Sequence, residues 1–131
     1  MPNSQNSQER DPNGIDQHSP GAKLDEGKPL AGLVLCNFAR ALETVVNVGT
    51  YGAKKYSPCG WLEVPNGIER YKDAMWRHIL SSNYDAQDPQ TGLLHLSHAC
   101  WNNLAVLELM ERNRFEVELG TQDFCKRTAT S

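Results

Sequence analysis

The chain has 131 residues, of which 39% are hydrophobic and 22% are charged, and its formal net charge is −3 at pH 7. That length suits one domain and is too short for two ordinary ones. The negative charge argues against direct nucleic-acid binding driven by bulk electrostatics, and no apolar stretch approaches the length of a membrane-spanning helix.

The cysteines and the N-terminus favour a cytoplasmic protein. The cysteines are widely spaced without a CxxC pair, and the polar N-terminus lacks the apolar stretch of a signal peptide. Two of them lie in apolar helical runs, where a free thiol behaves as a small hydrophobic group. We therefore interpret all four as reduced thiols, as is typical of the cytosol: Cys36, Cys59, Cys100 and Cys125.

Composition divides the chain into a folded domain between two polar tails. Residues 1–22 are rich in Asn, Gln, Ser, Pro and Asp and carry almost no large apolar side chain. Burial cannot offset the entropy of ordering such a segment. We therefore expect a disordered tail over 1–22, a helical domain over 23–112 and a polar C-terminal tail over 113–131.

The first helix is predicted over 30–48, where apolar residues recur at helical spacing and Gly49 follows as a stop signal. A loop is expected next, over 50–61, because it contains three structure breakers. Its paired lysines and its aromatic residues allow two interpretations. It is either a surface loop anchored by its aromatic rings, or a loop whose lysines bind phosphate while an aromatic ring stacks on a base. The side chains concerned are Lys54, Lys55, Tyr56 and Trp61.

A second helix is predicted over 69–80, entered after a Pro-Asn-Gly turn. One side of it is apolar. Another side carries Arg70, Asp73 and Arg77, with His78 at the border. This charged side is either an ordinary ion-paired surface or, if it looks towards the next helix, a set of cations that converges on a polar site.

The third helix is predicted over 93–112 and follows a turn over 85–92. One face of it carries His95, His98 and Asn102, and continues as an apolar face that should point into a core. Polar groups on a core face are costly unless they have partners. They are either satisfied core histidines or part of a metal or phosphate site, to which the acidic turn would contribute Asp85 and Asp88.

The fold class predicted from these elements is all-α, a small helical bundle. No alternating apolar pattern is long enough to predict a sheet. Three helices of this length make a thin core, so we expect the bundle to be completed by homo-oligomerisation.

Several short motifs follow one another over residues 23–110. They are Lys23-x-Asp25-x-Gly27-Lys28-Pro29, Tyr51-Gly52-Ala53-Lys54-Lys55-Tyr56 with Trp61, Arg70-Tyr71-x-Asp73-Ala74, Arg77-His78, Asp88, Gly92-Leu93, His95-Leu96, His98-Ala99 and Asn102. In this order they resemble the dATP/dGTP diphosphohydrolase N-terminal domain, a phage-encoded family that is similar to the broader MazG-like all-α nucleotide pyrophosphohydrolases.

The resemblance implies a MazG-like bundle that hydrolyses a purine deoxynucleoside triphosphate, dGTP or dATP, to the monophosphate and pyrophosphate. It also implies a divalent metal and a place in phage nucleotide metabolism, in some phages for a 2-aminoadenine genome. A phage-encoded chain would work in the host cytoplasm.

Residue roles follow from the charge of such a substrate. A triphosphate carries about four negative charges near pH 7, which a metal and several cations must offset while water attacks phosphorus. Mixed histidine and carboxylate ligation favours Mn²⁺ over Mg²⁺. We assign metal binding to His78, Asp88, His95 and His98, the phosphate clamp to Lys54, Lys55, Arg70 and Arg77, and purine contacts to Tyr56, Trp61 and Asn102. Asp73 would position or deprotonate the attacking water, with Arg77 as its catalytic partner.

The sequence departs from the MazG pattern in its carboxylates. The EExxE and ExxD motifs are absent, and Glu108-x-x-Glu111 is the only ExxE. A non-catalytic nucleotide-binding or interaction protein is therefore an alternative. The same domain type also occurs in a phage nucleotide kinase, although the chain has no GxxxxGK[ST] loop to hold ATP phosphates.

Overall fold

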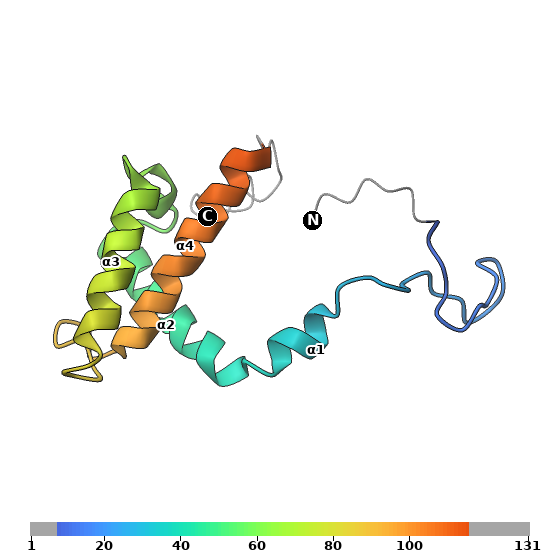
Figure 1. Cartoon of the computed structure of the whole chain (residues 1–131), viewed down its shortest axis with the longest axis horizontal. Helices are drawn as coiled ribbons and strands as arrows, with labels where there is room; N and C mark the ends of the chain where they lie inside the picture. Colours follow the sequence, from blue (N-terminus) through green and yellow to red (C-terminus); the bar gives the residue numbers. More distant parts are fainter. Residues whose placement is uncertain (1–7, 116–131) are drawn as a thin grey trace. The chain divides into compact units, whose positions relative to one another are not determined.

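The computed structural model describes residues 8–115 as helices joined by turns, without a strand (Figure 1). The elements are α1 (Ala31–Cys36), α2 (Ala39–Lys55), the short 3₁₀ helix η1 (Gly60–Glu63), α3 (Gly67–Ser81) and α4 (His95–Phe115). The all-α prediction is confirmed. Within these residues, no helix is both long and apolar enough to cross a membrane.

The chain divides into two compact units, the first ending at Asn37 and the second beginning at Phe38. In the first unit, the carboxylate of Asp11 accepts backbone N–H bonds from Asn13 at 2.7 Å, Lys23 at 2.9 Å and Ile15 at 3.3 Å. Residues 8–30 otherwise consist of short turns and irregular segments. The predicted disorder of 1–22 and the polar tail over 113–131 stay predictions, and residues 1–7 and 116–131 lie outside the described residues.

The single helix predicted over 30–48 is wrong, because the helical path is interrupted at Asn37 and Phe38. The side-chain amide of Asn37 donates to the carbonyl oxygen of Leu33 at 3.0 Å. A short polar side chain that bonds to helix carbonyls competes with the backbone for them, and this favours a break. No residue of α1 is buried.

The predicted helix end at Gly49 is also wrong, since α2 continues to Lys55. Gly49 lies against Trp101 of α4, where an added Cβ would be 3.0 Å from the indole Nε1. The glycine therefore permits close helix packing and does not end the helix. As a consequence, Lys54 and Lys55 belong to the last turn of α2 and not to a loop.

The second unit is built on α3 and α4, which lie side by side and run in opposite directions, while α2 packs against α4 (Figure 1). α3 and α4 agree with the helices predicted over 69–80 and 93–112 to within a few residues. The buried hydrophobic residues of the described chain are all small: Val45, Val48, Ala99, Ala105 and Val106. None of its side chains is less than 2% exposed.

The polar face predicted for α4 is confirmed as a buried face. His95, His98 and Asn102 are 6%, 8% and 7% exposed, and Val106 continues the same face. α4 begins at His95, two residues later than predicted, because the residues before it close the preceding turn through a β-bridge between Gln87 and Leu94.

The prediction that all cysteines are reduced is wrong for Cys59, which is disulfide-bonded. Cys36 and Cys100 are free thiols, as predicted. Cys125 lies outside the described residues. Cysteine spacing could not reveal the disulfide, because pairing requires two Cα atoms within about 7 Å and spacing does not report that distance.

Candidate functional site

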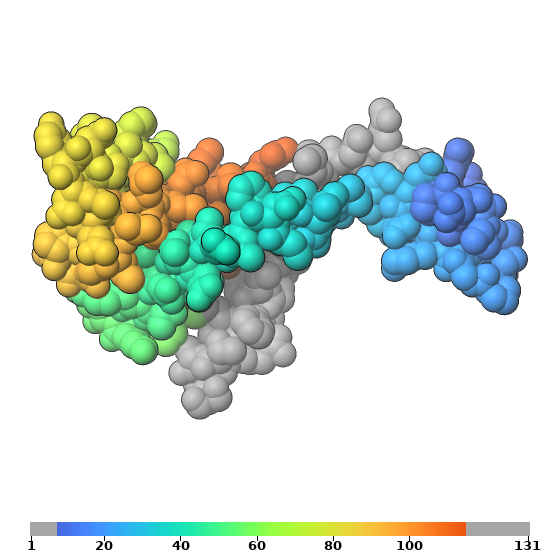
Figure 2. Space-filling view, turned by 90° about the horizontal axis from the view of Figure 1, so that it is seen from below, coloured from blue at the N-terminus to red at the C-terminus, as the bar shows by residue number. Residues whose placement is uncertain are grey.

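The turn over 82–94 joins α3 to α4 and is held by its own backbone. The N–H of Asp88 donates to the carbonyl of Leu93 at 2.7 Å, and that of Gly92 donates to the carbonyl of Asp88 at 2.7 Å. Gly92 has φ +72°, a conformation that other residues rarely adopt. In Figure 2 this turn, in yellow, forms a continuous surface with the start of α4, in light orange.

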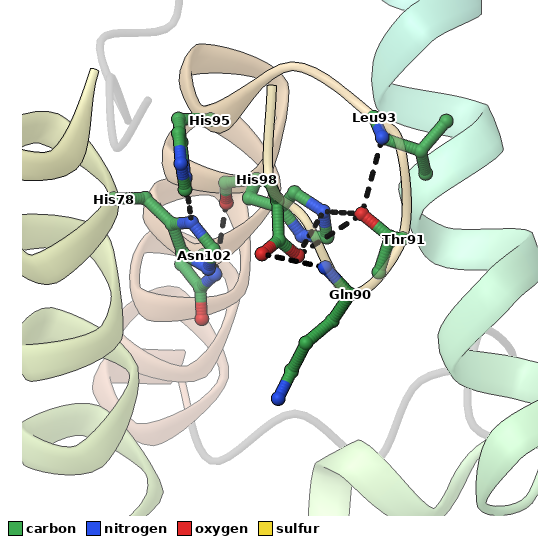
Figure 3. A network of polar contacts seen from close by, with 8 residues as sticks. His78, Gln90, Thr91, Leu93, His95, His98 and Asn102 are labelled. Atoms are coloured by element: carbon green, nitrogen blue, oxygen red, sulfur yellow. Dashed lines mark hydrogen bonds and ion pairs between the residues drawn. The ribbon is translucent and has the colours of Figure 1, made fainter. Parts of the chain in front are cut away.

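The turn closes around Thr91, whose hydroxyl bridges three groups (Figure 3). It donates to Asp88 Oδ2 at 3.0 Å, lies 2.8 Å from His98 Nε2, and accepts the N–H of Leu93 at 3.2 Å. An ionised carboxylate only accepts hydrogen bonds, so the single hydroxyl proton goes to Asp88. His98 must then donate from Nε2, and its neutral ring has an unprotonated Nδ1.

α3 brings a third imidazole to this place. The ring of His78 stacks on that of His98, with centroids 4.5 Å apart and planes 9° from parallel. Its Nδ1 lies 2.9 Å from Nδ1 of His95, within hydrogen-bonding distance (Figure 3). Such a bond needs one protonated and one unprotonated nitrogen, so it cannot survive when both rings are imidazolium. We call these five residues the histidine network: His78, Asp88, Thr91, His95 and His98.

The histidine network favours uncharged imidazole. Burial lowers the pKa of His78 from its usual value, and the neighbouring rings of His98 and His95 lower it further while Asp88 opposes them. Burial likewise lowers the pKa of His98, with Asp88 again opposing. Desolvation alone would raise the pKa of Asp88, but hydrogen bonds from Thr91 and from the N–H of Gln90 outweigh it and leave that pKa lowered.

The four predicted metal ligands therefore come together, but as a hydrogen-bonded network. Within residues 8–115, no group of three or more His, Cys, Asp or Glu side chains is arranged to hold a metal ion. The Nδ1 atoms of His78 and His95 face each other, and Nε2 of His98 is engaged by Thr91. In this arrangement the residues do not fit a metal, and no step proposed below depends on one.

One side of the histidine network opens to a depression of about 440 Å³. Asp88 and His95 contribute to its wall, together with Asp85, the other acidic residue of the turn. Ser81, Tyr84, Pro89 and Gln90 complete the lining. Two titratable members of the network thus line this depression.

Asn102 does not line this depression. Its side-chain amide donates to the carbonyl of His98 at 2.8 Å, one turn back along α4 (Figure 3). It is 7% exposed. In this position Asn102 supports the helix that carries His95 and His98.

Trp61 lies in a separate aromatic cluster. Its ring and those of Tyr71 and Trp101 make edge contacts with centroids 5.7 to 6.4 Å apart. The hydroxyl of Tyr71 donates to the carbonyl of Trp61 at 2.8 Å. These contacts join η1, α3 and α4, so the Trp61 ring already has packing partners on two sides.

The predicted phosphate-binding cations lie outside the histidine network. The ammonium group of Lys55 lies 5.2 Å from the ring centroid of Tyr56 and 6.0 Å from that of Tyr51. Arg70 donates to the carbonyl of Pro65 at 3.3 Å. Within residues 8–115, these groups and Lys54 form no ion pair, and no hydrogen bond joins them to the network.

Asp73 and Arg77 are exposed on α3, four residues apart. Arg77 is adjacent in sequence to His78, which is the link between this helix and the network. Neither side chain has a hydrogen bond or ion pair with another described residue.

Sequence reasoning did not place Thr91 in the site. Its hydroxyl nevertheless connects Asp88 to His98. Its position between an aspartate and Gly92 predicts a tight turn. That signal indicates local closure and does not reveal the histidine that the hydroxyl meets seven residues later.

The family model for dATP/dGTP diphosphohydrolase, N-terminal, matches residues 18–118, which is more than half of the chain. The chain belongs to this family. Among curated proteins and solved structures, no match was found. In this member of the dATP/dGTP diphosphohydrolase N-terminal family, the matched range contains the whole histidine network.

Proposed function

We propose that the chain hydrolyses dATP or dGTP to the monophosphate and pyrophosphate. The observation that carries this proposal is the family match over residues 18–118. In the reaction, water attacks the α-phosphorus, the bond from that phosphorus to the bridging oxygen breaks, and pyrophosphate leaves. The chain would have to accept one proton from the water and offset the phosphate charge.

The histidine network supports the proton-accepting part of this proposal. Lowered pKa values leave His78 and His98 uncharged near pH 7, and Asp88 ionised. Neutral imidazole and carboxylate are the groups that commonly take a proton from water. Asp88 and His95 line the depression, so a phosphate bound there would lie beside the network.

The substrate charge would be met by exposed cations that form no ion pair within residues 8–115. Arg77, next to His78 on α3, is the first of these, followed by Lys54, Lys55 and Arg70. Purine contacts of Tyr56, which is 76% exposed, belong to the same proposal. Dependence on Mn²⁺ or Mg²⁺ and a role in phage nucleotide metabolism stay predictions.

The test is incubation of the full chain with each deoxynucleoside triphosphate, with Mn²⁺, Mg²⁺ or a chelator, followed by separation of the products. We expect monophosphate and pyrophosphate from dATP or dGTP. Replacing a proton-accepting group reduces rates by about 10²–10⁴-fold in enzymes, so His98→Asn and His78→Asn should each lose most of the activity. His18→Asn, which changes an exposed histidine of the first unit, is the matched control and should retain it.

A second candidate, nucleotide binding without hydrolysis, is favoured by the absence of a metal-holding group within residues 8–115. Calorimetric binding of dATP or dGTP without any product would support this candidate over hydrolysis. If the chain neither binds nor cleaves these nucleotides, both candidates are wrong.

A further inference from the structure

The depression beside the histidine network has a negatively charged wall. Of the described residues that line it, Asp85 and Asp88 carry carboxylates, and none is a lysine or an arginine. A triphosphate carries about four negative charges, which cations must offset. Most of this wall therefore suits the uncharged part of a nucleotide, which is its base.

The two carboxylates differ in what they can still bind. Both oxygens of Asp88 accept hydrogen bonds, Oδ1 from the N–H of Gln90 at 3.3 Å and Oδ2 from the hydroxyl of Thr91 at 3.0 Å. The exposed Asp85 accepts only the N–H of Gln87, at 3.1 Å on Oδ1. Within residues 8–115, its Oδ2 has no partner. Asp85 is thus the acceptor that a ligand in the depression meets.

An aromatic ring adjoins this acceptor. Tyr84 lines the same depression and is 93% exposed, and its ring makes none of the ring–ring or cation–ring contacts between described residues. The end of α3 fixes both residues, since the N–H groups of Tyr84 and Asp85 donate to the carbonyl of Ser81 at 3.0 Å each. An uncovered ring is a surface on which a base stacks.

The acceptors of Asp85 distinguish the two purines. Guanine presents two neighbouring donors, N1–H and the N2 amino group, and a carboxylate has lone pairs on both oxygens to accept them. Adenine presents the acceptor N1 beside its N6 amino group, and a carboxylate repels an acceptor. Gln90 also lines the depression, and its amide supplies a donor for O6 of guanine. Figure 3 shows its side chain extending away from Thr91.

His95 brings one further polar atom to the depression. The residue is 6% exposed, and its ring is hydrogen-bonded through Nδ1 to His78. Within residues 8–115, Nε2 of His95 has no hydrogen-bond partner, yet no sealed side-chain nitrogen or oxygen lacks one there. Nε2 therefore has accessible surface, on the depression that His95 lines. This nitrogen is available to the sugar or the α-phosphate of a bound nucleotide.

The remaining phosphates have a path along α3. Ser81, which lines the depression, lies four residues after Arg77, so the two share one face of the helix. Arg70 is seven residues before Arg77 and lies on the same face. Phosphates that leave the depression past Ser81 thus meet arginines, while the base stays at the other end of the helix face, beside Tyr84.

We propose that this depression holds the base of a deoxyguanosine nucleotide, with guanine stacked on Tyr84 and its N1–H and N2 amino group donating to Asp85. Asp85 is then the residue that selects dGTP over dATP. This inference rests on the proposed function, for which it names the preferred base and the residues that recognise it.

The first experiment measures calorimetric binding of α,β-methylene analogues of dGTP, dATP and dXTP to the full chain with Mg²⁺. These analogues resist cleavage, so the readout is affinity and not activity. We expect the unaltered chain to prefer guanine over adenine by about 10- to 100-fold, the discrimination typical of a bidentate contact. Xanthine keeps N1–H but has a carbonyl at C2, so Asp85→Asn should lose the preference for guanine and favour xanthine, whose carbonyl accepts from the new amide.

Asp16→Asn is the matched control. Asp16 is an exposed aspartate of the first unit that accepts the N–H of His18, two residues later, as Asp85 does from Gln87. This variant should retain the preference for guanine. Thermal unfolding of both variants verifies that each is folded.

The second experiment concerns the ring of Tyr84. Tyr84→Ala should weaken binding of all three analogues by about 10-fold or more, because stacking is tolerant of the base, and should leave the ratio between guanine and adenine unchanged. Tyr84→Phe keeps the ring and should retain the affinity. Equal affinities for Tyr84→Ala and the unaltered chain would overturn the stacking.

The outcomes separate this inference from the proposed function. An unaltered chain that binds or cleaves both purine nucleotides equally would overturn the selection of guanine and leave the proposed function intact. A uniform loss of affinity for all three bases in Asp85→Asn would also overturn it, because Asp85 would then have a structural role. If the unaltered chain neither binds nor cleaves any of the nucleotides, both are wrong.

Discussion

Thr91 is the residue on which the polar interior of the site depends. Its hydroxyl uses its one proton and both lone pairs on Asp88, His98 and the backbone of Leu93. A buried group that loses its partner costs more than the hydrogen bond itself contributes. Thr91 thus keeps two titratable groups satisfied within one turn.

Thr91→Val should lower the free energy of unfolding by about 1–3 kcal/mol, because Asp88 and His98 then lose their shared partner without a change in volume. Thr50→Val removes a similar hydroxyl, which bonds to the carbonyl of Val46 on the exposed side of α2. This control should change stability much less. Urea unfolding of both variants measures the difference, and equal costs would contradict the role of Thr91.

At this scale, the buried residues of α4 could be predicted and their partners could not. Helical periodicity placed His95, His98 and Asn102 on one face because it depends only on local geometry. The stacking of His78 on His98 depends on how α3 meets α4, which no local pattern reports. The same limit applies to Trp61. An aromatic ring is compatible both with base stacking and with the packing on Trp101 observed here.

At the scale of elements, α2 shows that a glycine does not always end a helix. Gly49 and Gly52 both lie inside the helix, and the sequence suggests a stop at the first. An added Cβ would meet Trp101 at 3.0 Å from Gly49 but nothing within 4 Å from Gly52. Only a packing partner distinguishes the two glycines, and that partner is distant in sequence. α3 and α4 were predictable because apolar residues recur at helical spacing along each of them.

Gly52→Ala should stabilise the protein by about 0.5–1 kcal/mol, because alanine loses less backbone entropy in a helix. Gly49→Ala receives the same entropic gain but pushes against Trp101, so it should be the less stable variant of the pair. Thermal unfolding of the two variants compares them directly. A gain at Gly49 as large as that at Gly52 would show that α2 and α4 are more loosely packed than in the structure.

At the scale of the whole molecule, the histidine network couples stability to pH. The folded chain lowers the pKa of His78 and His98 below the usual 6.5. As pH falls through that value, these histidines bind protons in the unfolded chain but remain uncharged in the folded chain. The free energy of unfolding therefore decreases. Asp88, whose pKa is lowered from 3.8, acts in the same direction in a more acidic range.

We therefore expect a lower Tm at about pH 5.5 than at about pH 7.5, since the first histidines to titrate do so in this window. His18→Asn should retain the decrease, and the double variant His78→Asn with His98→Asn should reduce it. Scanning calorimetry at the two pH values tests this. A Tm that is the same at both would mean that the folded chain protonates these imidazoles as readily as the unfolded chain does.

The closure of the turn over 82–94 also has a kinetic consequence. α3, the turn and α4 are consecutive in sequence, so the whole histidine network forms within residues 78–98. Closing a short loop costs little chain entropy, and folds rich in local contacts assemble in microseconds to milliseconds. The helical hairpin should therefore be the earliest long-lived structure during refolding, and the network would be assembled before α2 docks on α4.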